Sequence, residues 1–215
     1  MFILDQQNSI ASQLLAEIRD VKVQNDPLRF RENMRKIGTL LAYEISKKLN
    51  YKSETIQTPL TNTEVKVLDE DIVIISILRA ALPFSQGFQD LFEKANFGFI
   101  GAARKPHLSD VEVEIDLDYL ATPNLNNKTV ILVDPMLATG KSMLKSIDQL
   151  LKNGIPKIIH IACTIAAPEG VRYLEEHLNT PYDLWSCAVD EKLNEKYYIV
   201  PGLGDAGDLA FGEKI

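Results

Sequence analysis

The sequence predicts a single α/β domain built on an open, mainly parallel, twisted sheet flanked by helices. Five continuous apolar runs have the pattern of strands that are buried on both faces, and helical stretches separate most of them. This alternation is typical of parallel strands joined by right-handed crossovers. The runs are residues 72–78, 97–103, 129–133, 158–166 and 184–189, and the helical stretches are 82–94, 140–153 and 168–178.

The composition supports one domain that spans residues 1–215, with 46% hydrophobic and 25% charged residues. A net charge of −7 argues against a general binder of nucleic acid or of membrane surfaces. No run approaches the roughly 18 apolar residues of a membrane span, and the first residues do not suggest a secretion signal. Cys163 and Cys187 lie in apolar runs, so we expect buried thiols and a reducing, cytoplasmic compartment.

The remaining elements are predicted from local signals. Asp26 is a good N-cap and Pro27 suits the first helical position, which indicates a helix from there to about residue 49. Residues 54–68 alternate around Thr61-Asn62-Thr63, as in a projecting β-hairpin. Residues 110–118 alternate acidic and apolar side chains, which suits a mobile strand or the edge of a flap.

The most informative stretch for function is the end of the run at 129–133. It ends on Asp134, and a short loop at 138–142 then leads into an amphipathic helix. Unpaired amides and the positive end of the helix dipole favour an anion there, most often phosphate. A carboxylate beside such a site is better placed to accept hydrogen bonds from sugar hydroxyls. This stretch therefore predicts a site for a phosphorylated ribose.

Two arginines are expected to face the same crevice as Asp134. Arg79 and Arg104 each fall at or just beyond the carboxyl end of a predicted strand, where open parallel sheets bind their ligands. Two familiar nucleotide motifs are not expected here. The P-loop pattern needs a glycine where Pro135 stands, and the glycine pattern at 202–207 has too little chain after it for a dinucleotide fold.

Three segments resemble uracil phosphoribosyltransferases, a family of type I phosphoribosyltransferases. They are residues 77–80 (Ile-Leu-Arg-Ala), 133–140 (Val-Asp-Pro-Met-Leu-Ala-Thr-Gly) and 198–208 (Tyr-Ile-Val-Pro-Gly-Leu-Gly-Asp-Ala-Gly-Asp), and the resemblance covers nearly the whole chain. It implies a Mg²⁺-assisted condensation of uracil with 5-phosphoribosyl 1-diphosphate that gives UMP and diphosphate. It also implies a C-terminal uracil-binding segment at about 197–212 and a homodimer or larger homo-oligomer.

The resemblance assigns roles to individual residues. Negative charge builds on the departing diphosphate, so fixed arginines should stabilise it, and Arg79, Arg104 and Asp134 are the expected catalytic residues. The expected contacts of the sugar diphosphate are Arg79, Arg104, Asp134, Pro135, Met136, Leu137, Ala138, Thr139, Gly140, Lys141, Ser142 and Asp205, and those of uracil are Ile199, Gly204, Asp205 and Ala206. Mg²⁺ should arrive with the diphosphate and keep several waters, so no protein metal ligand is expected.

Two alternative functions stay open. Lys141 resembles the purine-specific members, so a purine or xanthine phosphoribosyltransferase is one alternative, although Ala138 stands where those members place an Asp. A uracil-sensing RNA-binding regulator on the same fold is the other, although the net charge and the lack of a basic cluster argue against it. Leu209-Ala210 replaces a pair that commonly contains Arg in the family, so no role is carried over to these positions.

Overall fold

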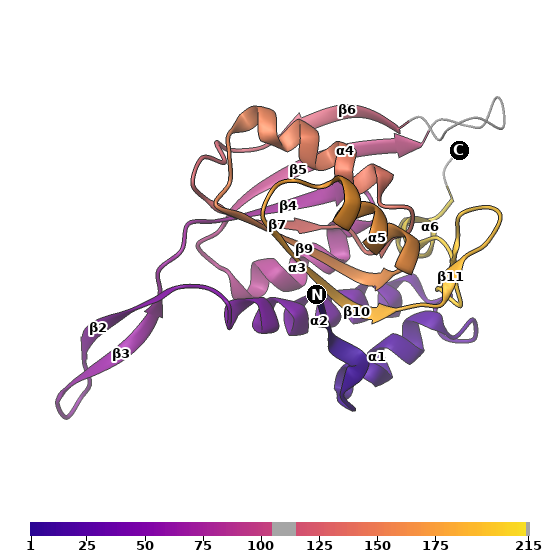
Figure 1. Cartoon of the computed structure of the whole chain (residues 1–215). Coiled ribbons are helices and arrows are strands. Elements are labelled where there is room, and N and C mark those ends of the chain that lie inside the picture. The colour runs from indigo at the N-terminus through magenta and orange to yellow at the C-terminus, as the bar shows by residue number, and fades with distance from the viewer. Residues whose placement is uncertain (105–114, 214–215) are drawn as a thin grey trace.

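An eight-stranded sheet forms the centre of the protein (Figure 1). The computed structural model describes residues 1–104 and 115–213, and the side chains of 102–104 and 115–118 lie outside that description. Within these limits the strand order is β1 (Phe2–Ile3), β10 (Tyr182–Val189), β9 (Ile158–Ala166), β7 (Thr129–Val133), β4 (Ile72–Leu78), β5 (Asn96–Arg104) and β6 (Ile115–Ala121), and β8 (Met136–Leu137) pairs with β9. All these pairs are parallel except β5 with β6, which confirms the predicted mainly parallel sheet.

Helices cover both faces of the sheet. On one face α1 (Ile10–Arg19), α2 (Pro27–Ser46) and α3 (Ala81–Leu91) bury one set of strand residues, which includes Ile74 and Ile131. On the other face α4 (Lys141–Leu150) and α5 (Pro168–His177) bury the alternate set, which includes Ile75 and Leu132. Neighbouring residues of one strand therefore enter opposite cores, and this explains why the strands read as continuous apolar runs.

The first long helix begins as predicted. The Asp26 side chain accepts hydrogen bonds from the amides of Leu28 and Arg29, and Pro27 takes the first helical position. α2 ends at Ser46, slightly before the expected residue 49. The helix packs closely on α3, because a Cβ built on Gly38 would lie only 2.1 Å from the carbonyl oxygen of Phe84.

The β-hairpin projects from the body of the protein (Figure 1). Its strands are β2 (Tyr51–Gln57) and β3 (Asn62–Leu68), so the hairpin starts three residues before the predicted residue 54. Every residue of β2 is exposed.

Other elements also differ slightly from their predicted bounds. The helix α4 begins at Lys141 and passes into a 3-10 turn, η2 (Leu151–Asn153). Of the expected strand or flap edge at 110–118, residues 110–114 lie outside the described range, and β6 covers the rest.

The N-terminal elements were not predicted. η1 (Leu4–Gln6) follows β1, and α1 begins after Ser9, whose hydroxyl accepts the amide of Ala11. β1 has only two residues, which is too short for a recognisable alternation of apolar and polar side chains.

No helix of the described residues combines the length and the apolar character needed to cross a membrane.

Candidate active site

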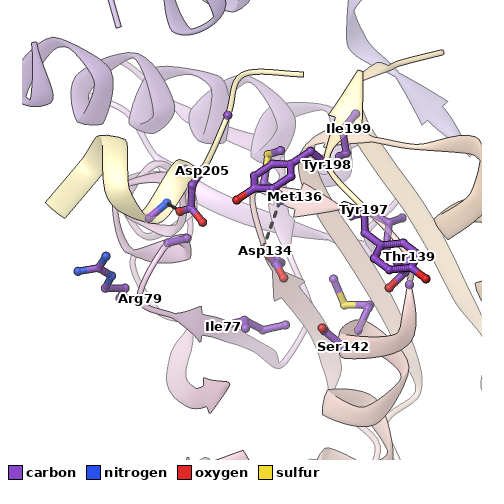
Figure 2. A pocket seen from close by; sticks show the side chains of 18 of the residues that line it. Ile77, Arg79, Asp134, Met136, Thr139, Ser142, Tyr197, Tyr198, Ile199 and Asp205 are labelled. Carbon is purple, nitrogen blue, oxygen red and sulfur yellow. Dashed lines mark hydrogen bonds between the residues drawn. The ribbon is translucent and has the colours of Figure 1, made fainter. Parts of the chain in front are cut away.

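A cavity of about 180 Å³ lies beyond the carboxyl ends of β4 and β7, which are neighbours in the sheet (Figure 2). Ligands of open parallel sheets bind at this place. The C-terminal segment, with β12 (Ile199–Val200) and α6 (Ala206–Phe211), supplies further lining residues. The full lining is Ile77, Leu78, Arg79, Ala80, Asp134, Met136, Leu137, Ala138, Thr139, Gly140, Ser142, Met143, Tyr197, Tyr198, Ile199, Gly204, Asp205, Ala206 and Gly207.

Asp134 connects the sheet with the loop that follows it. Its amide donates to the carbonyl of Ala162 in β9 (3.1 Å), which fixes the end of β7. Its Oδ1 accepts the amide of Met136 (3.2 Å), so the carboxylate also caps the turn into β8. The side chain lines the cavity from this anchored position, which suits a group that must orient a ligand.

The loop at residues 138–142, here called the phosphate loop, ends in the first turn of α4. Gly140 is the N-cap with φ 77°, a left-handed conformation that glycine adopts at little cost. The hydroxyl of Thr139 accepts the amide of Lys141 (3.4 Å), and the first-turn amides have no intrahelical acceptor. Ser142 lines the cavity next to this helix start, so amides and helix dipole together favour an anion there.

The N-terminus of α5 supports the phosphate loop by direct contact of main chains. A Cβ built on Gly170 would lie 2.3 Å from the carbonyl oxygen of Ala138, and one built on Gly140 would lie 2.8 Å from the carbonyl oxygen of Gly170. Only glycines allow this approach. The loop is therefore held by a helix before any ligand arrives, and such preorganisation is what an anion site needs.

Arg79 follows β4 and lines the cavity from the opposite side. Its Nη2 donates to Asp208 Oδ1 (2.7 Å) and to the carbonyl of Gly212 (2.6 Å), so it joins β4 to the C-terminal segment. Its Nε is buried and has no hydrogen-bond partner among the described residues. The Leu78–Arg79 peptide bond is cis. Arg79 thus forms a structural ion pair with Asp208, and its Nε–H group still has no acceptor among the described residues.

Asp205 has a structural role of its own. Its Oδ1 accepts the amides of Gly207 (2.8 Å) and Asp208 (3.0 Å), so it caps α6 while it lines the cavity. Gly204, with φ 93°, precedes it, and Ala206 is the first residue of the helix. Gly204, Asp205, Ala206 and Gly207 thus bring the start of α6 to the wall of the cavity.

Several predicted residues lie elsewhere. Arg104 ends β5, next to β4, so its backbone reaches the same edge of the sheet, but its side chain lies outside the described residues. Pro135 does not line the cavity, because its carbonyl is turned to β9, where it accepts the amides of Thr164 and Ile165. Lys141 does not line it either, since it begins α4 with an exposed side chain. Pro135 therefore offers the cavity neither an amide nor its carbonyl, whereas Lys141 still places its main-chain amide in the first turn of α4.

Tyr197 and Tyr198 were not assigned as site residues, yet both line the cavity (Figure 2). They lie between β11 (Lys192–Leu193) and β12, and Tyr197 has φ 60°, which is unusual for a bulky residue. The sequence offers one indication of this role, which is that both tyrosines directly precede Ile199, a predicted uracil contact. Ile77, Leu78, Ala80, Met143 and Gly207 also line the cavity, as neighbours of residues that were predicted.

The charges of the cavity matter for a polyanionic ligand. Among the described lining residues, Asp134 and Asp205 are carboxylates and Arg79 is the cation. No group of three or more His, Cys, Asp or Glu side chains in the described parts of the chain could hold a metal ion. Among the described residues, Arg79 and the main-chain amides at the start of α4 are therefore the groups of this cavity that suit an anion.

The fold defines the class of protein. It matches the solved structure of a protein from Aquifex aeolicus with a TM-score of 0.87 and 30% identity over 100% of both chains. It also matches a hypoxanthine phosphoribosyltransferase from Staphylococcus aureus with a TM-score of 0.50 and 15% identity, over 87% of this chain and 84% of that one. The fold is that of the type I phosphoribosyltransferases.

Sequence comparison gives the family within this class. The chain belongs to the uracil phosphoribosyltransferase family, whose pattern matches residues 5–213. It is 43% identical to the uracil phosphoribosyltransferase of Porphyromonas gingivalis over 212 residues, which cover 99% of this chain and 98% of that protein. It is 38% identical to that of Pyrococcus furiosus over 207 residues, or 94% and 86% of the two chains.

Proposed function

We infer that the protein transfers the 5-phosphoribosyl group of 5-phosphoribosyl 1-diphosphate to uracil, which gives UMP and diphosphate. Family membership over nearly the whole chain supports this activity. The structural observation that carries it is the shared cavity. One wall joins Asp134 to the start of α4, whose first amides suit an anion, and the other is the C-terminal segment with its own helix start.

The sugar and its 5′-phosphate would occupy the wall formed by β7 and α4. The amides of residues 139–142 would hold the phosphate, and the Asp134 carboxylate would accept hydrogen bonds from the ribose hydroxyls. Each charge-assisted hydrogen bond contributes about 1.5–3 kcal/mol. Because Gly170 and Gly140 fix the loop by main-chain contact, these donors need no rearrangement to receive the ligand.

The diphosphate would lie beside Arg79. Negative charge builds on this leaving group as the anomeric C–O bond breaks, and a guanidinium aimed at it lowers the barrier. The buried, unpartnered Nε of Arg79 supports this assignment. Arg104 is proposed as the second cation because β5 delivers it to the same edge of the sheet.

The donor set also fits a magnesium ion that arrives with the substrate. The cavity offers two carboxylates and each already accepts a main-chain amide, so the described residues do not form a complete oxygen cage. Mg²⁺ commonly keeps waters and substrate phosphates as ligands. When bound, it would neutralise part of the diphosphate charge. Asp205 would contact it through water.

Uracil would be recognised by main chain. It presents two carbonyl acceptors that flank one N–H donor, and we propose that amides at residues 204–206 and the carbonyl of Ile199 match this pattern. Cytosine reverses two of these contacts, and each buried mismatch costs about 1–3 kcal/mol. Ala138 offers no carboxylate to a purine ring, which argues against the purine alternative.

We further propose a cytoplasmic homodimer. Two buried free thiols suit a reducing compartment. The β-hairpin has a strand that is exposed along its whole length, with Ile56 and Leu60 at 41% and 94% exposure, so it offers apolar surface to a second copy. The magnesium requirement, the dimer and the location are all open to direct test.

The deciding experiment incubates the purified protein with uracil, 5-phosphoribosyl 1-diphosphate and Mg²⁺ and measures UMP. Parallel reactions with hypoxanthine and xanthine test the purine alternative, and an RNA-binding assay tests the regulator. UMP formation that falls by orders of magnitude in Arg79→Ala would support the proposal. Turnover of a purine, or RNA retention without UMP, would reject it.

A further inference from the structure

The segment that carries the proposed uracil contacts is held from behind by side chains that do not line the cavity. This segment, residues 199–206, is here called the base loop. Behind it lie Arg19, the last residue of α1, and Asp190, which directly follows β10. Arg19 belongs to the N-terminal region, and no residue of that region contacts a substrate in the proposed function.

Arg19 and Asp190 form a bidentate ion pair. Arg19 Nη2 lies 2.6 Å from Asp190 Oδ1, and Nη1 lies 2.8 Å from Oδ2. The Asp190 side chain is only 4% exposed and that of Arg19 only 20%. Removing one partner of such a pair leaves a buried charge without compensation, so each side chain strongly favours keeping the other in place.

The ion pair binds both polar main-chain groups of Gly202 through hydrogen bonds. Its amide donates to Asp190 Oδ2 (2.7 Å), and its carbonyl accepts from Arg19 Nη1 (3.1 Å). Both polar main-chain groups of one base-loop residue are thus bound by the same ion pair. Gly202 has φ 64°, and a Cβ there would lie 2.1 Å from the carbonyl oxygen of Ile199, so the loop turns tightly at this point.

The next residue is tied to the same N-terminal region. The side-chain amide of Gln24, 8% exposed, donates to the carbonyl of Leu203 (3.2 Å) and to those of Ile18 (2.9 Å) and Arg19 (3.2 Å). Two consecutive base-loop residues are therefore anchored to the end of α1. The chain then passes at once into residues 204–206, the proposed uracil donors.

We propose that Arg19 and Asp190 are positioning residues for uracil, an inference that rests on the proposed function of the base loop. They do not touch the base. They set the place of Gly202, and through it the spacing between the carbonyl of Ile199 and the amides of residues 204–206. Because hydrogen bonds weaken steeply with poor geometry, a small loop movement weakens uracil binding more than diphosphate binding.

The test compares Arg19→Lys with the wild type in UMP formation. Lysine keeps the charge and can reach one Asp190 oxygen, but it cannot form the fork that also holds Gly202. We expect the KM for uracil to rise by about tenfold and the KM for the sugar diphosphate to change by less than about twofold. Arg35→Lys is the matched control, since the Arg35–Asp90 pair has a 2.6 Å contact but is 42% exposed on both sides. It joins α2 to α3, and neither residue lines the cavity.

Amide hydrogen exchange supplies a readout that does not depend on turnover. In Arg19→Lys, and in Asp190→Asn as a second variant, the amides of 202–206 should exchange faster while those of 136–144 keep their rates. An unchanged uracil KM with unchanged exchange, or equal changes in both substrates and both segments, would overturn the positioning role. If the wild type made no UMP, the proposed function would fail, and exchange would still decide whether the pair holds the loop.

Discussion

A methyl group added at Gly170 should damage the phosphate loop more than the fold. In Gly170→Ala the new Cβ would lie 2.3 Å from the carbonyl oxygen of Ala138 and 3.1 Å from that of Leu137. Both are main-chain atoms that cannot rotate away. An ordinary contact begins at 3.4 Å, so α5 and the loop must separate by about 1 Å.

A displacement of this size has two separate consequences. Overpacking of this kind destabilises a protein by about 1–3 kcal/mol. A misplacement of about 1 Å at a site where positioning controls the reaction can lower the rate by about 100-fold. We therefore expect kcat/KM for the sugar diphosphate to fall by about 100-fold in protein that is still folded at the assay temperature.

The assay measures kcat/KM for each substrate together with thermal unfolding. Gly38→Ala is the matched control, because its Cβ would lie 2.1 Å from the carbonyl oxygen of Phe84, where α2 packs on α3 away from the cavity. It should lose similar stability and keep near-normal activity per folded molecule. Wild-type kcat/KM in Gly170→Ala, or an equal loss in Gly38→Ala, would refute the reasoning.

Three further predictions concern other parts of the molecule. Asp134→Asn keeps the acceptor for the Met136 amide but loses the charge, so UMP formation should fall by orders of magnitude with an unchanged melting temperature; full activity would contradict its role. Burial lowers the pKa of His160, whose Nδ1 accepts the indole N–H of Trp185, so the unfolded chain binds a proton more readily than the folded protein. The free energy of unfolding should therefore decrease as pH falls below about 6.5, and His160→Gln, measured by denaturant unfolding across pH, should flatten this decrease. Burial raises the pKa of both Cys163 and Cys187 to about 12, so a thiol reagent should label neither in the native protein and both after unfolding in guanidinium; rapid native labelling would show that they are accessible.

The main features of the fold and site could be predicted because they depend on local patterns. A strand buried on both faces must be apolar throughout, and this holds for β4, β7 and β9. Parallel strands bring their carboxyl ends to one edge, so Arg79 and Asp134 were expected in one crevice, and both line the cavity. The family resemblance added the C-terminal segment, which no local pattern identifies as a uracil site.

Other features could not be predicted from single segments. The extra lining by Tyr197 follows from a left-handed turn between two very short strands, and sequence gives no clear signal for either. Pro135 and Lys141 belong to the predicted motif, yet the direction of the chain at β8 and at the start of α4 keeps their side chains out of the cavity. Whether a motif residue faces inward depends on backbone geometry rather than on its identity.

The amino-acid sequence by itself determined the α/β class, the edge of the sheet that carries the cavity, and the helix start and carboxylate that are proposed to bind the ligand. These follow from periodicity, from residue type and from the direction of parallel strands. Only the tertiary structure decided that Arg19 would meet Asp190, 171 positions away, and that Gly170 would touch the loop at Ala138. Such contacts join segments that are far apart in the chain, and no local property of either segment encodes the partner.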